Sequence, residues 1–106
     1  MKVLAVDIGG TKLAAALVSE SGEVAGQREV PTPPSELGGA HLAGELARLV
    51  ASVHDGSATV AAIASAGPLD VGRGTISPVN IAAWRDFDVV ACVRSATGLD
   101  GCEEAI

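Results

Sequence analysis

The stretch KVLAVDIGGTKLAAALV, residues 2–18, contains two apolar runs separated by a short segment with two adjacent glycines. The runs at residues 2–6 and 13–18 are almost continuously apolar, which is typical of short strands buried in a sheet. Adjacent glycines readily take the positive φ of a tight turn. The stretch therefore predicts a hairpin with Gly9 and Gly10 in its turn.

Further elements are expected along the chain. A third strand at residues 23–30 follows the turn SESG, and the spacing of leucines and valines predicts a helix over 35–53 with Ser35 as its N-cap. The run TVAAIA predicts a strand at 59–64, and a last helix is expected at 86–97. This β-β-β-α-β-α order predicts an α/β fold with a mixed sheet. It resembles the ribonuclease H-like half-domain of actin-like ATPases and phosphotransferases.

Composition and charge narrow the class of function. The chain has 106 residues, 13 Asp and Glu against 7 Lys and Arg, and a formal net charge of −6. An acidic chain is a poor partner for a nucleic-acid backbone, so no nucleic acid is expected. With no apolar run of about 18 residues and no cleavable leader, we expect no membrane partner and a cytoplasmic location. Cys92 and Cys102 are too few for a disulfide framework and are expected to be free thiols.

The turn carries a pattern suited to phosphate. Asp7 ends the first strand, where its carboxylate could hold Mg²⁺ with phosphate oxygens on the far side of the ion. Gly9 and Gly10 have no Cβ, so their amides can approach a phosphate closely, while Thr11 adds a hydroxyl and Lys12 a charge. The spacing fits neither the P-loop nor the dinucleotide fingerprint. The alternative is an ordinary turn with a solvated lysine.

Two more motifs follow in order, IASAGPLD at residues 63–70 and SPVNIAAW at 77–84. Together with DIGGTK they resemble the ROK family of sugar kinases and sugar-responsive repressors, and especially its bacterial glucokinases, over about residues 1–99. The resemblance implies binding of ATP and Mg²⁺, with Asp7 at the metal, and of a hexose such as glucose. It assigns the ATP phosphates to Asp7, Gly9, Gly10, Thr11 and Lys12, and the sugar to Gly67 and Asn80.

The resemblance fails at the family's catalytic triplet. In ROK kinases the strand after a TGL turn ends in Glu-Asn-Asp, where Asn holds the sugar and Asp takes the proton from its hydroxyl. Aligning the TGL at residues 97–99 places the triplet on Glu104, Ala105 and Ile106, so only Glu is kept. Because Ile106 cannot accept a proton, we expect no catalytic residue in this chain. The preceding DGCE is polar and looks like a turn rather than a strand.

Cys102 also matches part of the family's zinc loop, C-x-C-G-x-x-G-C-x-E. The first two cysteines of that loop are missing here, and tetrahedral zinc needs four ligands, so no zinc is expected.

Three functions follow as expectations. The leading one is ATP-dependent hexose phosphorylation of glucokinase type by the parent family, with residues 1–106 as a single N-terminal actin-like lobe that lacks the second lobe and is inactive alone. The second is a non-catalytic sugar- or nucleotide-binding fragment. The third, a ROK-type sugar-responsive transcription regulator, is disfavoured because the first strand begins at Lys2, with no room for a helix-turn-helix before it. An exposed sheet surface leaves a homodimer open.

Overall fold

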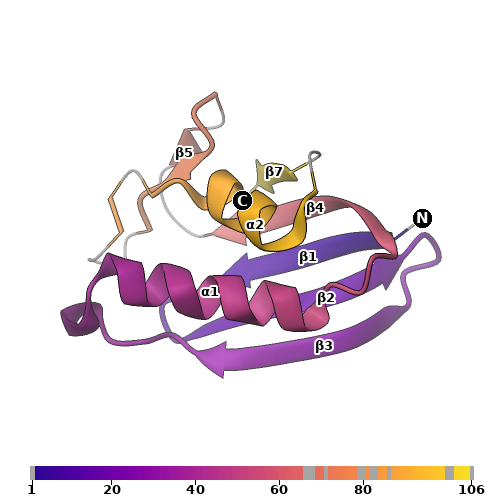
Figure 1. The fold of residues 1–106 in the computed structure, drawn as a ribbon, viewed down its shortest axis with the longest axis horizontal. Coiled ribbons are helices and arrows are strands. Elements are labelled where there is room, and N and C mark those ends of the chain that lie inside the picture. The colour runs from indigo at the N-terminus through magenta and orange to yellow at the C-terminus, as the bar shows by residue number, and fades with distance from the viewer. Residues whose placement is uncertain are drawn as a thin grey trace.

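The computed structural model describes residues 2–65, 69–70, 72–78, 81, 84–85, 87–99 and 102–105, and it has the expected α/β architecture (Figure 1). A five-stranded sheet has the order β3-β2-β1-β4-β7. Its strands are β1 (Lys2–Ile8), β2 (Lys12–Ser19), β3 (Val24–Pro31), β4 (Ala58–Ser65) and β7 (Cys102–Ala105). The other elements are the 3₁₀ turn η1 (Ser35–Leu37), the helices α1 (Gly39–Val53) and α2 (Val89–Thr97), and a hairpin of β5 (Leu69–Asp70) and β6 (Thr75–Ile76).

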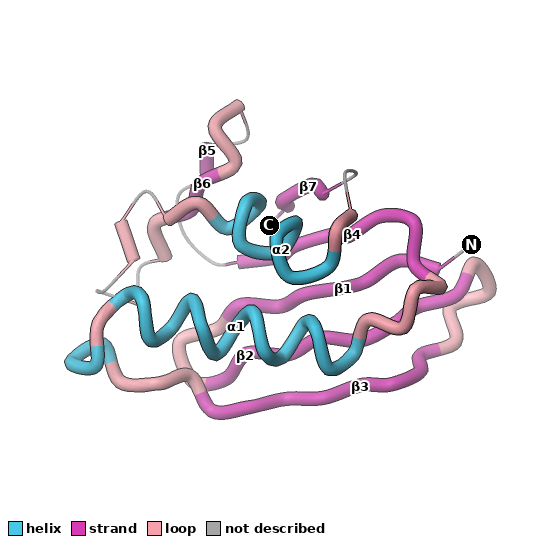
Figure 2. Tube along the Cα trace, in the orientation of Figure 1, coloured by secondary structure: helices cyan, strands magenta, loops and turns pink. Residues whose placement is uncertain are grey.

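The sheet is mixed. Strands β1, β2 and β3 form an antiparallel meander, while β1 runs parallel to β4 and β4 parallel to β7 (Figure 2). Asp7 of β1 pairs in register with Ala64 of β4, and Ala64 pairs with Ala105 of β7. The carboxyl ends of the three parallel strands therefore meet at one edge of the sheet, which is where open α/β sheets usually bind ligands.

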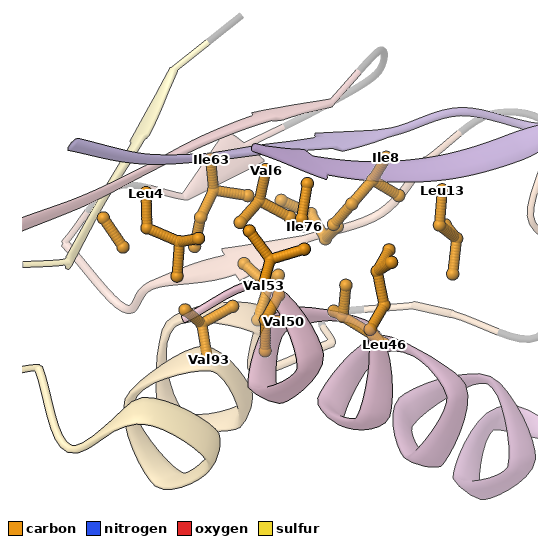
Figure 3. Packing of buried hydrophobic residues seen from close by; sticks show 14 of the residues in the cluster. Leu4, Val6, Ile8, Leu13, Leu46, Val50, Val53, Ile63, Ile76 and Val93 are labelled. Atoms are coloured by element: carbon orange, nitrogen blue, oxygen red, sulfur yellow. The ribbon is translucent and has the colours of Figure 1, made fainter. Parts of the chain in front are cut away.

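The core lies between one face of the sheet and the two helices (Figure 3). Alternate residues of β1, namely Leu4, Val6 and Ile8, are at most 2% exposed and point toward the helices. Helix α1 meets them with an apolar stripe at helical spacing, which consists of Leu42, Leu46, Leu49, Val50 and Val53. The stripe on α1 is the pattern that predicted this helix. Strand β1 was predicted from its apolar run, and the alternation is in the burial of its residues.

The start of α1 differs from the prediction. The expected helix at 35–53 is divided into η1 and α1 by Gly38, whose φ of 91° and ψ of 159° are accessible to glycine and strained for other residues. The N-cap of α1 is therefore Gly38, without a side-chain cap hydrogen bond, rather than Ser35.

Helix α2 begins three residues later than expected. The carboxylate of Asp88 accepts a hydrogen bond from the amide of Ala91, so Asp88 is the N-cap. Gly98, with φ 77°, ends the helix as predicted.

Two further expectations are corrected. The segment DGCE, residues 100–103, was expected to be a turn, but Cys102 and Glu103 belong to strand β7, which pairs with β4 at the edge of the sheet. An edge strand has one pairing partner and tolerates polar residues. The loop expected between residues 67 and 78 contains the β5–β6 hairpin, which is held to the body of the protein by a bridge between Ile76 and Phe87.

Trp84 is a core residue. Its side chain is 1% exposed and stacks on Phe87 with a centroid separation of 4.0 Å. Among the described residues, no helix is both long and apolar enough to cross a lipid bilayer.

Gly44 lies inside α1 and weakens it without a packing reason. A Cβ placed there would meet only the guanidinium of Arg48, at 3.7 Å. Replacing Gly44 with alanine should raise the free energy of unfolding by about 0.5–1 kcal/mol, because glycine loses more backbone freedom in a helix. Urea denaturation followed by circular dichroism measures this change. A lower stability for Gly44→Ala would contradict the packing described for α1.

Candidate functional site

The turn between β1 and β2 is closed by its own backbone. The amide of Gly9 donates a hydrogen bond to the carbonyl of Lys12 at 3.0 Å. A Cβ on Gly9 would lie 3.0 Å from that same oxygen, so the close approach of the two strands favours glycine at this position. The sequence-based explanation was wrong here, because neither Gly9 nor Gly10 is among the glycines with positive φ. Glycine is explained at position 9 by the lack of room for a Cβ, and not by a positive φ.

The turn leaves two amides available. The Gly9 amide, expected to face a phosphate, is used within the turn. In the part of the chain that the structure describes, the amides of Gly10 and Thr11 and the hydroxyl of Thr11 have no hydrogen-bond partner, and both residues are exposed. Successive free backbone amides in a turn form a concavity suited to an anion.

Thr32, which follows β3, forms two hydrogen bonds with this turn. Its hydroxyl donates to the carbonyl of Gly9 at 2.6 Å, and its amide donates to the carbonyl of Thr11 at 2.9 Å. Sequence reasoning missed this residue. The signal was the hairpin register: once Leu13 pairs with Val30, Thr11 must lie opposite Thr32.

Asp7, predicted to hold Mg²⁺, lies near the end of β1, next to the turn. It lies on the sheet face opposite the helices, since its neighbours Val6 and Ile8 point into the core. Its strand neighbours are Ala14 and Ala64, and the exposed carboxylate has no hydrogen bond or ion pair with any described residue. Nor does any group of three or more His, Cys, Asp or Glu within the described ranges come together to hold a metal. A single free carboxylate fits Mg²⁺, which keeps several waters and takes its other oxygens from phosphates.

Lys12 forms an ion pair with Glu29. Its ammonium lies 3.0 Å from the carboxylate of Glu29 on β3, and the two side chains are 59% and 48% exposed. An exposed ion pair is worth about 0–1 kcal/mol, so a doubly charged phosphate can compete with Glu29 for Lys12. Glu29 is the second residue that sequence reasoning missed, because it lies next to Lys12 only through the β2–β3 pairing.

A shallow hollow of about 430 Å³ runs along the open face of the sheet beside Asp7. Its walls are mostly small side chains, including Ala5, Ala14, Ala16, Ala62 and Ala64. Asp7 is the one residue it shares with the predicted phosphate site. The hollow is therefore a feature of the bare sheet face and is not the phosphate site itself.

The two residues predicted to contact sugar, Gly67 and Asn80, lie outside the described residues. The strand that leads to Gly67 is described: β4 ends at Ser65, which pairs with Ile8 at the end of β1. Strand β4 thus ends at the same edge of the sheet as the turn between β1 and β2.

Cys92 is a free thiol away from this edge. Its sulfur contacts the carbonyl of Ala43 at 3.6 Å, and burial between the helices raises the pKa of the thiol. Cys92 is partly buried against the core, and a thiol with a raised pKa is a poor nucleophile, so Cys92 is a packing residue.

Residues 3–102 match the ROK family. The chain belongs to the ROK family. It is 40% identical over 99 residues to an N-acetylmannosamine kinase of Yersinia pseudotuberculosis serotype O:1b (strain IP 31758), an alignment that covers 92% of this chain and 33% of that kinase. The chain thus spans about one third of the length of the curated relatives it matches.

Solved ROK structures share the fold. The ROK hexokinase from Thermus thermophilus superposes with a TM-score of 0.79 at 32% identity, over 99% of this chain and 35% of the hexokinase. A ROK family glucokinase from Streptomyces griseus, crystallised with glucose and AMPPNP, gives a TM-score of 0.82 at 30% identity, over 98% of this chain and 32% of the glucokinase. The fold expected from the sequence is therefore confirmed as the actin-like half-domain of ROK kinases.

Proposed function

We propose that residues 1–106 form the N-terminal, phosphate-binding lobe of a ROK sugar kinase that transfers the γ-phosphate of ATP to a hexose. The observation that carries the proposal is the edge of the sheet where the free amides of Gly10 and Thr11 follow the unpaired carboxylate of Asp7. Phosphoryl transfer depends on positioning and on neutralising charge, and this edge offers groups for both.

Each residue has a separate role in the proposal. Gly10 and Thr11 donate their amides to phosphate oxygens, and Lys12 moves from Glu29 to the phosphates. Gly9 keeps the turn closed. Asp7 would hold Mg²⁺, which neutralises phosphate charge when bound.

For the sugar, the proposal names a class of acceptor rather than one compound. Gly67 and Asn80 are proposed to contact the hexose, on the strength of their motifs. Glucose was the expected substrate, and the relatives are named for N-acetylmannosamine, hexose and glucose. We therefore propose a hexose or an N-acetylhexosamine as the class of acceptor.

A second candidate, a non-catalytic nucleotide-binding domain, is favoured by one observation. Strand β7 runs parallel to β4 and brings Ala105 into the row of Ala64 and Asp7. The position after it, where the family's general base is expected, is Ile106, which has no proton acceptor. On this candidate the lobe binds nucleotide without turning over sugar. The homodimer and the regulator function stay predictions.

A nucleotide titration and an activity assay together test both candidates. Adding magnesium and AMPPNP to ¹⁵N-labelled protein should shift the amide signals of Gly10 and Thr11 and leave Gly22, in the turn at the other end of β2, unchanged. A coupled assay with ATP and glucose or N-acetylmannosamine should show no turnover. Unshifted turn signals at millimolar nucleotide would reject both candidates, and measurable turnover would reject the second.

A further inference from the structure

A proline-rich segment, called the strap below, leads from the end of β3 to η1 and contacts the phosphate-binding turn. Its sequence is Pro31-Thr32-Pro33-Pro34. Each proline ring restricts its own φ, and Pro33 also confines Thr32 to extended conformations. Pro34 is extended, with φ −59° and ψ 140°. Thr32, the one residue of the strap with a polar side chain, is therefore held at a defined place.

Thr32 binds the turn at two carbonyls. Its hydroxyl donates to Gly9 at 2.6 Å, and its amide donates to Thr11 at 2.9 Å. In a planar trans peptide the carbonyl and the amide of the same unit point in opposite directions. The carbonyl of Gly9 shares its peptide unit with the amide of Gly10, so a hydrogen bond that holds this carbonyl toward Thr32 turns the Gly10 amide away from the strap.

We propose that Thr32 is a positioning residue for the phosphate-binding turn, and this inference rests on the proposed function. The hydroxyl of Thr32 aims the amide of Gly10 outward, where it can donate to a phosphate oxygen. The same hydrogen bond polarises the peptide unit and makes the Gly10 amide a better donor. Without it, a turn containing glycine can rotate this peptide and lose the donor.

The test compares three variants of the full chain. Thr32→Val keeps the shape and the backbone hydrogen bond to Thr11 but removes the hydroxyl. Thr32→Ser restores the hydroxyl. Thr59→Val makes the same chemical change at an exposed position of β4, far from the turn in the sequence, and serves as the matched control.

Affinity for AMPPNP with magnesium is measured by titration of the turn amides. We expect Thr32→Val to bind about five- to tenfold more weakly, the effect of one lost hydrogen bond. Thr32→Ser should bind within about twofold of the parent chain, and Thr59→Val should bind as tightly as the parent. Equal affinity of Thr32→Val and the parent would overturn the proposal, as would a loss in Thr32→Ser as large as that in Thr32→Val.

A second measurement separates this inference from the proposed function. Hydrogen exchange and the chemical shift of the Gly10 amide are recorded without nucleotide. Faster exchange and a shifted signal in Thr32→Val, but not in Thr32→Ser or Thr59→Val, support the positioning role even if the parent chain binds no nucleotide. An unchanged Gly10 amide in Thr32→Val overturns it, whatever the binding result.

Discussion

Replacing Trp84 with alanine is expected to lower the free energy of unfolding by about 3–5 kcal/mol. The side chain is 1% exposed and stacks on Phe87, and its indole nitrogen donates to the carbonyl of Gly39 at 3.2 Å. The substitution therefore leaves a cavity and removes the indole hydrogen bond to Gly39 at the start of α1. Small domains are stable by only about 5–15 kcal/mol, so this loss would leave a large unfolded fraction.

Urea denaturation followed by far-ultraviolet circular dichroism measures this loss, because the variant has no tryptophan fluorescence. Leu37→Ala is the control, since Leu37 is 56% exposed and its loss should change stability by no more than about 0.5 kcal/mol. If the two variants were equally stable, Trp84 would not be a core residue.

The second large effect is expected on ligand binding. Asp7→Asn keeps the shape of the side chain but removes the charge proposed to hold magnesium. Loss of a residue that only supports a metal ligand typically costs about 10–100-fold in affinity, so a direct ligand should cost at least as much. We therefore expect binding of AMPPNP with magnesium to weaken by about tenfold to a hundredfold. Stability should hardly change, because the exposed carboxylate makes no hydrogen bond or ion pair with the described residues.

Calorimetric titration with and without magnesium decides the role of Asp7. Glu23→Gln, in the turn between β2 and β3, removes one negative charge far from the site and should bind as the parent does. In EDTA the parent and Asp7→Asn should bind AMPPNP about equally. A loss of the same size in EDTA would mean that Asp7 does not act through a metal.

The strands and helices were predictable because their signals are local. The apolar runs of β1, β2 and β4 mark them as strands of a sheet, and the stripe on α1 records which face of the helix is buried. Prediction failed where a single backbone conformation, or a residue distant in the chain, determines whether an element forms or where it begins. Gly38 interrupts a helix that the apolar pattern continues through, and β7 exists because β4 offers it a pairing edge.

The candidate site divides in the same way. The motif DIGGTK identified Asp7, Gly9, Gly10, Thr11 and Lys12 as candidate residues, because a carboxylate, a short turn and a cation are adjacent in the chain. The structure uses the Gly9 amide inside the turn instead.

By itself, the sequence determined the succession of β1, β2, β3, α1, β4 and α2, the family and the residue types present at the first turn. Only the tertiary structure decided that Gly9 closes that turn, that Glu29 pairs with Lys12 and that Thr32 donates hydrogen bonds to the turn. It also decided that Ala105 shares a row with Asp7. The physical reason is that these contacts join residues far apart in the chain, so they arise only when strand pairing sets the register.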